Sequence, residues 1–377
     1  ALRTDRAQDP FDAGKGGLGQ VAGDLHLRLM VDGHQFVDPA QGHAADPGGG
    51  GQLGAYAVDI HPAPLVADGV DHQFVDLVGA LKKRSKDVLN ILIGELKKNK
   101  VNILLNSQVR EIKTKNKLIS KIILNNGKEI IADKYILTTG GKSYPITGST
   151  GDGFNWIKLL GHTLNEPRPA LSPVEIKENW VKELSGTSLQ DIGLNIWVNN
   201  KIIRKWRGDI LFAHFGITGP LVLDKSKGID EFIKEKNMML SIDLFPDKSL
   251  DVFDQYFSKI IDKNKNSSIK KILSLIIPNK MVDYILSFSK IDYSKKGNNI
   301  SKQERIKLEN ILKKITIHPV GLLGFDKSMI TSGGVSLKEI DSKTMKSKIL
   351  DNLFFAGEII DLDGPCGGYN LQICWTT

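Results

Sequence analysis

Near the carboxyl end of the chain, an apolar strand runs into a glutamate and then into a glycine-rich loop. Gly357 and Glu358 follow the strand at residues 352–356, and the loop at 361–372 has glycines at 364, 367 and 368. Such glycines let backbone N–H groups face a ligand, and a helix beginning near Tyr369 would stabilise negative charge at its N-terminus. This suits a reduced flavin, which gains negative charge at its N1/O2 edge, while Glu358 can accept hydrogen bonds from ribityl hydroxyls. The alternative is a glycine-rich turn without a ligand.

A second apolar strand, at residues 134–137, runs into Thr138, Thr139, Gly140 and Gly141. A backbone can approach a ligand closely where two glycines follow a strand. Residues 142–153 are dense in Gly, Ser, Thr and Pro, and a helix is expected from about 154 to 160. The sequence therefore predicts a second place where backbone faces a ligand.

Several long motifs, in register from about residue 86 to 375, resemble the aminoacetone-oxidase-like family of bacterial FAD flavoproteins. This family includes bile-acid dehydro-reductases and belongs to the two-dinucleotide-binding-domain flavoproteins. The motifs that carry the resemblance are Thr138–Pro145, Thr147–Gly153, His214–Pro220, Ser332–Val335 and Gly357–Gln372. The resemblance implies an α/β fold in which an FAD-binding Rossmann-like domain carries an inserted β-rich domain and a helical subdomain.

The resemblance also implies which residues would hold FAD. They are Val109 on the adenine side; Thr139, Gly140 and Gly141 near the pyrophosphate; Gly357 and Glu358 on the ribityl side; Asp363 and Gly364; and Gly367, Gly368, Tyr369, Asn370 and Leu371 on the ring side. The family's first strand, glycine-rich loop and helix should precede Lys86, and residues 1–80 do not supply them. The Rossmann-like domain is therefore expected to be incomplete, and two interpretations stay open: a working flavoprotein, or a chain that binds FAD poorly or not at all.

Residues 1–80 differ sharply in composition from the rest of the chain. They contain one Lys, three Arg, eleven Asp and no Glu, together with fourteen Gly and five of the eight His. Gly14–Gly19 matches the pattern G-x-G-x-x-G, but the residues before it do not form an apolar strand, so a dinucleotide loop is not expected there. The segment is either a disordered leader or a foreign sequence from a wrong frame or an artificial junction, and the abrupt change favours the second interpretation.

From Leu81 onward, the pattern of apolar residues divides the chain into three regions. The expected boundaries are 81–171 with 331–377 for the FAD-binding domain, 172–248 with 316–330 for the β-rich inserted domain, and 249–315 for the helical subdomain. The last region is Lys-rich and amphipathic, with a break at Pro278, and the β-rich region contains a predicted hairpin at 196–203.

The chain carries a formal net charge of +8, and all of the positive excess lies after residue 80. The lysines come in scattered pairs without interleaved aromatic residues, so no nucleic-acid partner is expected. No apolar run is long enough for a membrane span, and the histidine spacing fits no metal site. Two cysteines are too few for a disulfide framework, which favours a cytoplasmic location. The oligomeric state is left open.

The function that follows is that of an FAD-dependent oxidoreductase. FAD would take hydride from a reduced nicotinamide, NADH or NADPH, or from a small organic substrate, and pass it to an acceptor. No catalytic side chain can be assigned: Tyr144, His214 and Cys366 are possible proton donors or substrate contacts, but no partner stands beside them in the sequence. The alternative is an inactive fragment or a degenerate flavoprotein that lacks the first dinucleotide-binding loop.

Overall fold

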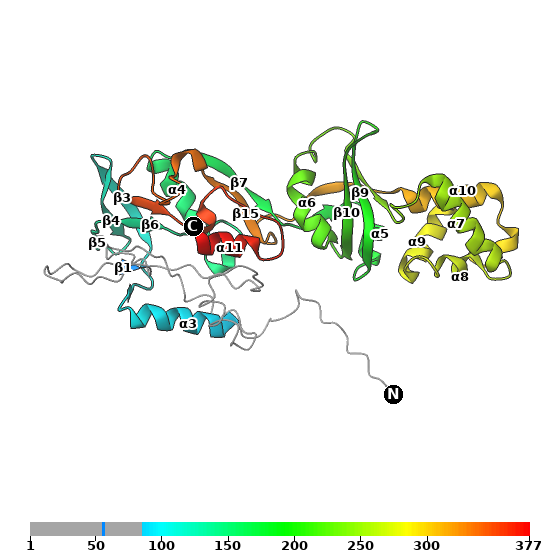
Figure 1. Cartoon of the computed structure of the whole chain (residues 1–377), viewed down its shortest axis with the longest axis horizontal. Coiled ribbons are helices and arrows are strands. Elements are labelled where there is room, and N and C mark those ends of the chain that lie inside the picture. Colours follow the sequence, from blue (N-terminus) through cyan, green and yellow to red (C-terminus); the bar gives the residue numbers. More distant parts are fainter. Residues whose placement is uncertain (1–54, 57–84) are drawn as a thin grey trace. The chain divides into compact units, whose positions relative to one another are not determined.

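A computed structural model describes residues 55–56 and 85–377, and these form two compact units (Figure 1). Unit 1 contains the described residues up to Arg168 together with Ile330–Thr377, and unit 2 is Pro169–Met329. The expectations for residues 1–80, including the Gly14–Gly19 motif, lie outside the described residues except at Ala55–Tyr56. Within the described ranges, no helix is long and apolar enough to cross a membrane.

Unit 1 is built from short strands and a few helices. Its elements are β1 (Ala55–Tyr56), α3 (Ser85–Lys98), β2 (Asn102–Ile103), β3 (Val109–Lys115), β4 (Leu118–Leu124), β5 (Glu129–Ile130), β6 (Tyr135–Leu137), η1 (Pro145–Thr147), α4 (Asp152–Leu159), β7 (Leu164–Ala170), β15 (Ile330–Val335), η3 (Leu337–Glu339), β16 (Leu353–Phe355), η4 (Gly357–Ile359) and α11 (Tyr369–Thr376). Strands β3, β4 and β5 form an antiparallel sheet, β1 pairs with β2 in parallel, and β6 pairs with β16 in parallel.

The core of unit 1 lies between the β6–β16 pair, strand β4 and helix α4. Tyr135, Phe355, Ile122 and Ile157 are each at most 1% exposed and belong to one apolar cluster. Helix α4 turns Phe154, Trp156 and Ile157 inward, as its amphipathic spacing predicts. This core holds the ends of β6 and β16, from which the candidate site begins.

Unit 2 is an antiparallel sheet of seven strands in the order β13-β12-β9-β10-β11-β8-β14. The strands are β8 (Val174–Ile176), β9 (Ser188–Val198), β10 (Lys201–Ala213), β11 (Gly216–Thr218), β12 (Met239–Asp243), β13 (Ile315–Ile317) and β14 (Pro319–Leu322). The predicted hairpin is confirmed: Asn199 and Asn200, both with positive φ, join β9 to β10. Asparagine tolerates this left-handed backbone better than most residues, which explains its place in the turn.

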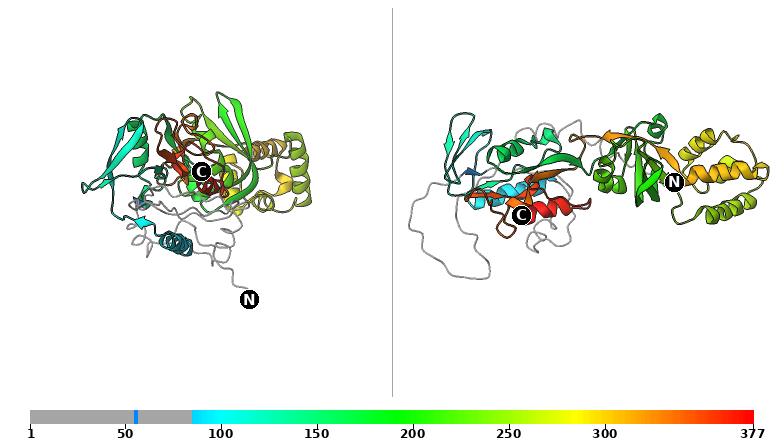
Figure 2. Two further views of the ribbon diagram at one scale, coloured as in Figure 1. Left: turned by 60° about the vertical axis from the view of Figure 1, so that its left-hand side comes forward. Right: turned by 90° about the horizontal axis from the view of Figure 1, so that it is seen from above.

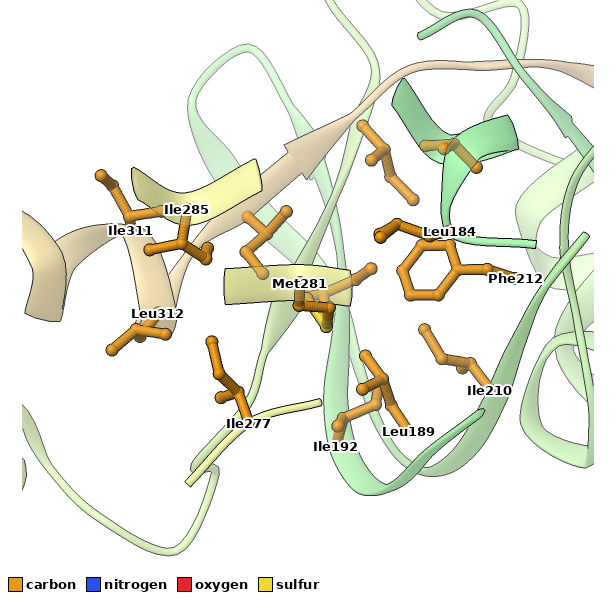
Figure 3. Packing of buried hydrophobic residues seen from close by; sticks show 14 of the residues in the cluster. Leu184, Leu189, Ile192, Ile210, Phe212, Ile277, Met281, Ile285, Ile311 and Leu312 are labelled. Carbon is orange, nitrogen blue, oxygen red and sulfur yellow. The ribbon is translucent and has the colours of Figure 1, made fainter. Parts of the chain in front are cut away.

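The helices of unit 2 are α5 (Asn179–Glu183), α6 (Pro220–Asp230), α7 (Leu250–Lys263), α8 (Ile269–Leu273), α9 (Asn279–Ser289) and α10 (Lys302–Lys313). Helices α7 to α10 gather beyond one end of the sheet (Figures 1 and 2). The break expected at Pro278 is confirmed, because α9 begins directly after it. One apolar cluster continues from the sheet into these helices, with Met281 of α9 lying between Phe212 of β10 and Leu312 of α10 (Figure 3).

Candidate cofactor-binding site

The pairing of β6 with β16 brings two predicted binding segments to one sheet edge. Leu137 pairs with Phe355 across the two parallel strands, and the Leu137 carbonyl accepts a 3.2 Å hydrogen bond from the Ala356 amide. Thr138–Gly141 and Gly357–Glu358 therefore leave the sheet side by side, at the carboxyl ends of parallel strands. In open α/β sheets this is the edge at which ligands bind.

Thr331 of β15 ties these two segments together, and the sequence analysis did not single it out. Its hydroxyl oxygen accepts hydrogen bonds from the amides of Lys142, at 2.7 Å, and Ser143, at 3.1 Å. Its own amide donates to Oε1 of Glu358. The loop after β6 and the carboxylate after β16 are thus fixed to the same buried residue.

The space beside Gly141 is filled by neighbouring side chains, so only glycine fits at this position. A Cβ added to Gly141 would lie 2.4 Å from Oγ1 of Thr331 and 2.8 Å from Oε1 of Glu358. Gly140 and Gly357 have φ values of 69° and 76°, in the left-handed region that glycine adopts without strain. The backbone at Gly141 therefore lies close to Thr331 and Glu358, and its approach to a ligand stays a prediction.

Asn370, in the first turn of α11, closes the glycine-rich loop before this helix. Its Oδ1 accepts a 2.8 Å hydrogen bond from the Gly364 amide, and its Nδ2 donates to the Gly364 carbonyl at 2.9 Å. Gly367 and Gly368 have positive φ values of 114° and 93°, and Gly368 is the residue before the helix. Asp363, at the start of the loop, accepts a 2.9 Å hydrogen bond from the Ser332 hydroxyl. The loop is therefore held in shape by Asn370 at its end and by Ser332 of β15.

Helix α11 also packs against η4, the segment after β16, and η4 in turn contacts β15 (Figure 1). The Gly357 amide donates a 2.9 Å hydrogen bond to the hydroxyl of Thr377 at the end of this helix. Burial of the Cys374 thiol and the nearby charge of Glu358 raise the pKa of Cys374 to about 11, although the residue as a whole is exposed. Cys374 therefore stays a neutral thiol at physiological pH.

Several polar atoms near the strand ends suit a bound polar cofactor. The hydroxyl oxygens of Thr138 and Thr139, and Oε1 of Gln372 in α11, are buried without a hydrogen-bond partner in the part of the chain that the structure describes. Buried polar groups normally have partners, so such atoms indicate a missing one. Together with Gly141 and Glu358, they fit a dinucleotide that brings hydroxyl and phosphate groups to this edge. No group of three potential metal ligands occurs among the described side chains.

The remaining predicted site residues occupy different places. Val109 begins β3, pairs with Leu124 and packs partly buried on the core of unit 1, and no described contact joins it to the strand-end segments. The Tyr369 side chain lies beside Gly364 and Gly367 and is largely exposed, while Leu371 is half-buried in α11.

The three possible proton donors also differ in their surroundings. Tyr144 ends the loop after β6 with φ 50°, and burial raises its pKa above the ordinary value. His214 is exposed in the turn between β10 and β11 of unit 2, edge-on to Phe215. Cys366 is partly buried in the glycine-rich loop. Only Tyr144 and Cys366 belong to segments of the candidate site.

The chain is similar in sequence to known bacterial proteins over most of its length. The chain is 28% identical over 295 residues to the 3-dehydro-bile acid delta(4,6)-reductase of Clostridium scindens. The aligned region covers 78% of this chain and 71% of the relative. The chain is also 28% identical over 294 residues to the ribosomal RNA dihydrouridine synthase of Escherichia coli, covering 78% and 70% of the two chains. The enzyme of the same name from Haemophilus influenzae is 27% identical over 295 residues, covering 78% and 71%.

The match to a protein family spans most of the chain. Residues 78–377 match the family described as HI0933-like protein Rossmann domain. The matched range begins close to residue 80, where the composition of the chain changes. The predicted α/β fold with a Rossmann-like domain is thereby confirmed, as is the resemblance to flavoproteins related to bile-acid reductases. This chain belongs to the HI0933-like family of Rossmann-fold flavoproteins.

Proposed function

We propose that this protein is an FAD-dependent reductase that uses NADH or NADPH, or a small organic substrate, as hydride donor and reduces an unsaturated acceptor. The observation that carries the proposal is the meeting of Thr138–Gly141 and Glu358 at one edge of the β6–β16 pair. The names of the relatives support it, because both a delta(4,6)-reductase and a dihydrouridine synthase denote the addition of hydrogen. When bound, FAD would supply the hydride chemistry.

The residues of this chain would bind and orient the cofactor. Glu358 can accept hydrogen bonds from ribityl hydroxyls, while the positive-φ glycines Gly140 and Gly357 let the backbone come close to the cofactor. The N-terminus of α11, after Gly368, would favour negative charge on the reduced ring. Thr138 and Thr139 would find partners for their buried hydroxyls.

The test is anaerobic reduction. The purified full chain is mixed with FAD, freed of excess cofactor, and titrated with NADH and, separately, with NADPH, while the long-wavelength flavin absorption is followed. We expect one of the two to bleach the bound flavin. Bound flavin that neither nucleotide reduces would contradict a nicotinamide donor, and the absence of bound flavin would favour the inactive fragment. Cys366 and Cys374 form no disulfide with each other, which supports the proposal of a cytoplasmic location.

A second candidate acceptor is a uridine base in RNA, and a feature of unit 2 favours it. Residues 250–313, which contain α7 to α10, hold thirteen Lys or Arg and seven Asp or Glu. Beside them, the rings of Trp180 and Tyr284 stack at 3.9 Å and those of Tyr284 and Phe288 at 5.9 Å, with Phe288 63% exposed. An exposed ring at the end of a stack, near lysines, can take an unpaired base.

This candidate differs from the expectation that no nucleic acid is bound, because folding places aromatic rings from α5 and α9 together that the sequence keeps apart. The test is retention of a single-stranded RNA by the full chain at low and high salt, for the wild type and Phe288→Ala. Leu275→Ala, at another exposed apolar residue, is the control. RNA binding that does not weaken at high salt, or that Phe288→Ala leaves unchanged, would contradict the proposal that RNA is the acceptor.

A further inference from the structure

We propose that Thr331 is the positioning residue of the cofactor site: its hydroxyl shapes the loop after β6 and its amide aims the carboxylate of Glu358. This inference rests on the proposed function, because the segments that Thr331 joins are those expected to hold FAD. Thr331 would act through these segments and not by touching the reacting atoms.

The first observation is the fixed carboxylate. Thr331 is buried in β15, with 2% of its surface exposed. Its backbone amide donates a hydrogen bond to Oε1 of Glu358. A strand amide cannot rotate away, so it sets the direction of the carboxyl group. The second carboxylate oxygen is thereby given a defined position relative to the sheet edge.

The second observation is the hydroxyl of Thr331. Its oxygen has two lone pairs and accepts from the amides of Lys142 and Ser143. The Ser143 hydroxyl lies 3.1 Å away, and because both lone pairs are already used, Thr331 donates its own hydrogen to Ser143. Every bonding site of the Thr331 hydroxyl is therefore occupied by the loop that follows Gly140 and Gly141.

The third observation is the lack of spare room around this contact. Gly141 passes so close that an added Cβ would lie 2.4 Å from Oγ1 and 2.7 Å from Cβ of Thr331. Directly after Gly141, the amides of Lys142 and Ser143 donate hydrogen bonds to that hydroxyl. Without that acceptor, the Lys142 and Ser143 amides lose their partner, and the Gly140–Gly141 backbone loses its position relative to Glu358.

Three substitutions in the full chain separate positioning from simple packing. Thr331→Val keeps the shape of the side chain but removes the acceptor, and Thr331→Ser keeps the acceptor but removes the methyl group. Thr218→Val, at a buried threonine of β11 in unit 2, is the matched control. We expect Thr331→Val to weaken FAD binding about tenfold or more, which corresponds to the loss of one or two hydrogen bonds. Thr331→Ser and Thr218→Val should stay within about threefold of the wild type.

A second readout does not depend on FAD. Hydrogen–deuterium exchange of the unliganded chain should show faster exchange of the Lys142 and Ser143 amides in Thr331→Val, and wild-type protection in Thr331→Ser. If Thr331→Val does not fold, Thr331→Cys takes its place in the test, because a thiol is a weak hydrogen-bond acceptor. The Thr331→Cys variant should bind FAD more weakly than Thr331→Ser, and its Lys142 and Ser143 amides should exchange faster.

The outcomes distinguish this inference from the proposed function. Wild-type protein that binds no FAD would refute the proposed function, and with it the cofactor part of this inference, while the exchange data would still show whether Thr331 orders the loop. Wild-type protein that binds FAD, with Thr331→Val equal to it in affinity and exchange, would overturn the inference alone. Equal losses in Thr331→Val and Thr331→Ser would also overturn it, because they would assign the effect to the methyl group.

Discussion

Leu137 and Phe355 pair directly across two short parallel strands, although they are far apart in the sequence. Each is the last residue of its strand, so the Thr-Thr-Gly-Gly and Gly-Glu segments begin at the same level of one sheet edge. The candidate site depends on this register, because shifting either strand would separate Glu358 from Gly141.

Replacing Gly141 with alanine should damage the candidate site. The added Cβ would meet Oγ1 of Thr331 at 2.4 Å and Oε1 of Glu358 at 2.8 Å, so the carboxylate or the loop has to move. We expect FAD affinity to fall about tenfold or more, from overpacking worth roughly 1–3 kcal/mol. Gly321→Ala is the control, since no atom in the part of the chain that the structure describes lies within 4 Å of its added Cβ. Equal FAD affinity in both variants would contradict the arrangement.

Two helical glycines provide a matched test of packing in unit 1. A Cβ on Gly153 of α4 would lie 1.9 Å from Oγ1 of Thr139, whereas one on Gly94 of α3 would meet no atom of the described residues within 4 Å. Gly153→Ala should lower the free energy of unfolding by about 1–3 kcal/mol through overpacking. Gly94→Ala should leave it unchanged or raise it by up to about 1 kcal/mol, because alanine is the better helix former. Chemical denaturation measures both free energies. A Gly153→Ala variant as stable as the wild type would show that Gly153 of α4 is not closely packed against Thr139.

The expected site follows from the sequence only in part, for physical reasons. Gly140, Gly141 and Glu358 could be predicted, because glycines after apolar strands and a glutamate at a strand end are local patterns. Thr331 could not, because its partners lie on segments remote in sequence, and only the adjoining residues 332–335 formed a recognisable motif.

The same limit applies to the elements themselves. The helix expected at about 154–160 is α4 at Asp152–Leu159, and the strand expected at 134–137 is β6 at Tyr135–Leu137. Apolar spacing locates such elements, whereas hydrogen bonds to distant strands decide where they end. The stack of Trp180, Tyr284 and Phe288 is likewise a product of tertiary folding.

Glu309 of α10 should make the stability of unit 2 depend on pH. Burial, followed by a hydrogen bond with Asp254, raises the pKa of Glu309 to about 7, with Arg305 opposing the shift. The folded state therefore binds the proton more tightly than the unfolded state. This contribution to stability is complete below about pH 4.5 and is lost as the pH rises through 7.

Glu309→Gln, which stays neutral, should remove that dependence. We expect the melting temperature of the wild type to fall more steeply between pH 5 and about 8 than the melting temperature of Glu309→Gln. Parallel pH profiles of the two proteins would show that Glu309 is ionised in the folded state.

His162 should make the stability of unit 1 depend on pH in the direction opposite to that of Glu309. Ser347 Oγ accepts hydrogen bonds from the amides of Ile349 and Leu350, so it donates its hydrogen to Nε2 of His162 at 2.8 Å, and the imidazole is neutral. Burial lowers the pKa of His162, while the charge of Glu339 raises it less. Its stabilising contribution is present above about pH 6.5 and is lost as the pH falls below that value.

His162→Gln places an amide oxygen near the position of Nε2 and does not titrate. Urea denaturation at pH 7 and at about pH 5 should show a smaller loss of stability in this variant than in the wild type. A loss as large in the variant would assign the acid sensitivity to other groups.

The most direct test of the proposed function is the visible absorption spectrum of the full chain after incubation with FAD and gel filtration. We predict flavin bands that elute with the protein and are released when it is denatured. A colourless protein fraction, with all of the FAD in the later small-molecule fractions, would contradict a working cofactor site at the β6–β16 edge.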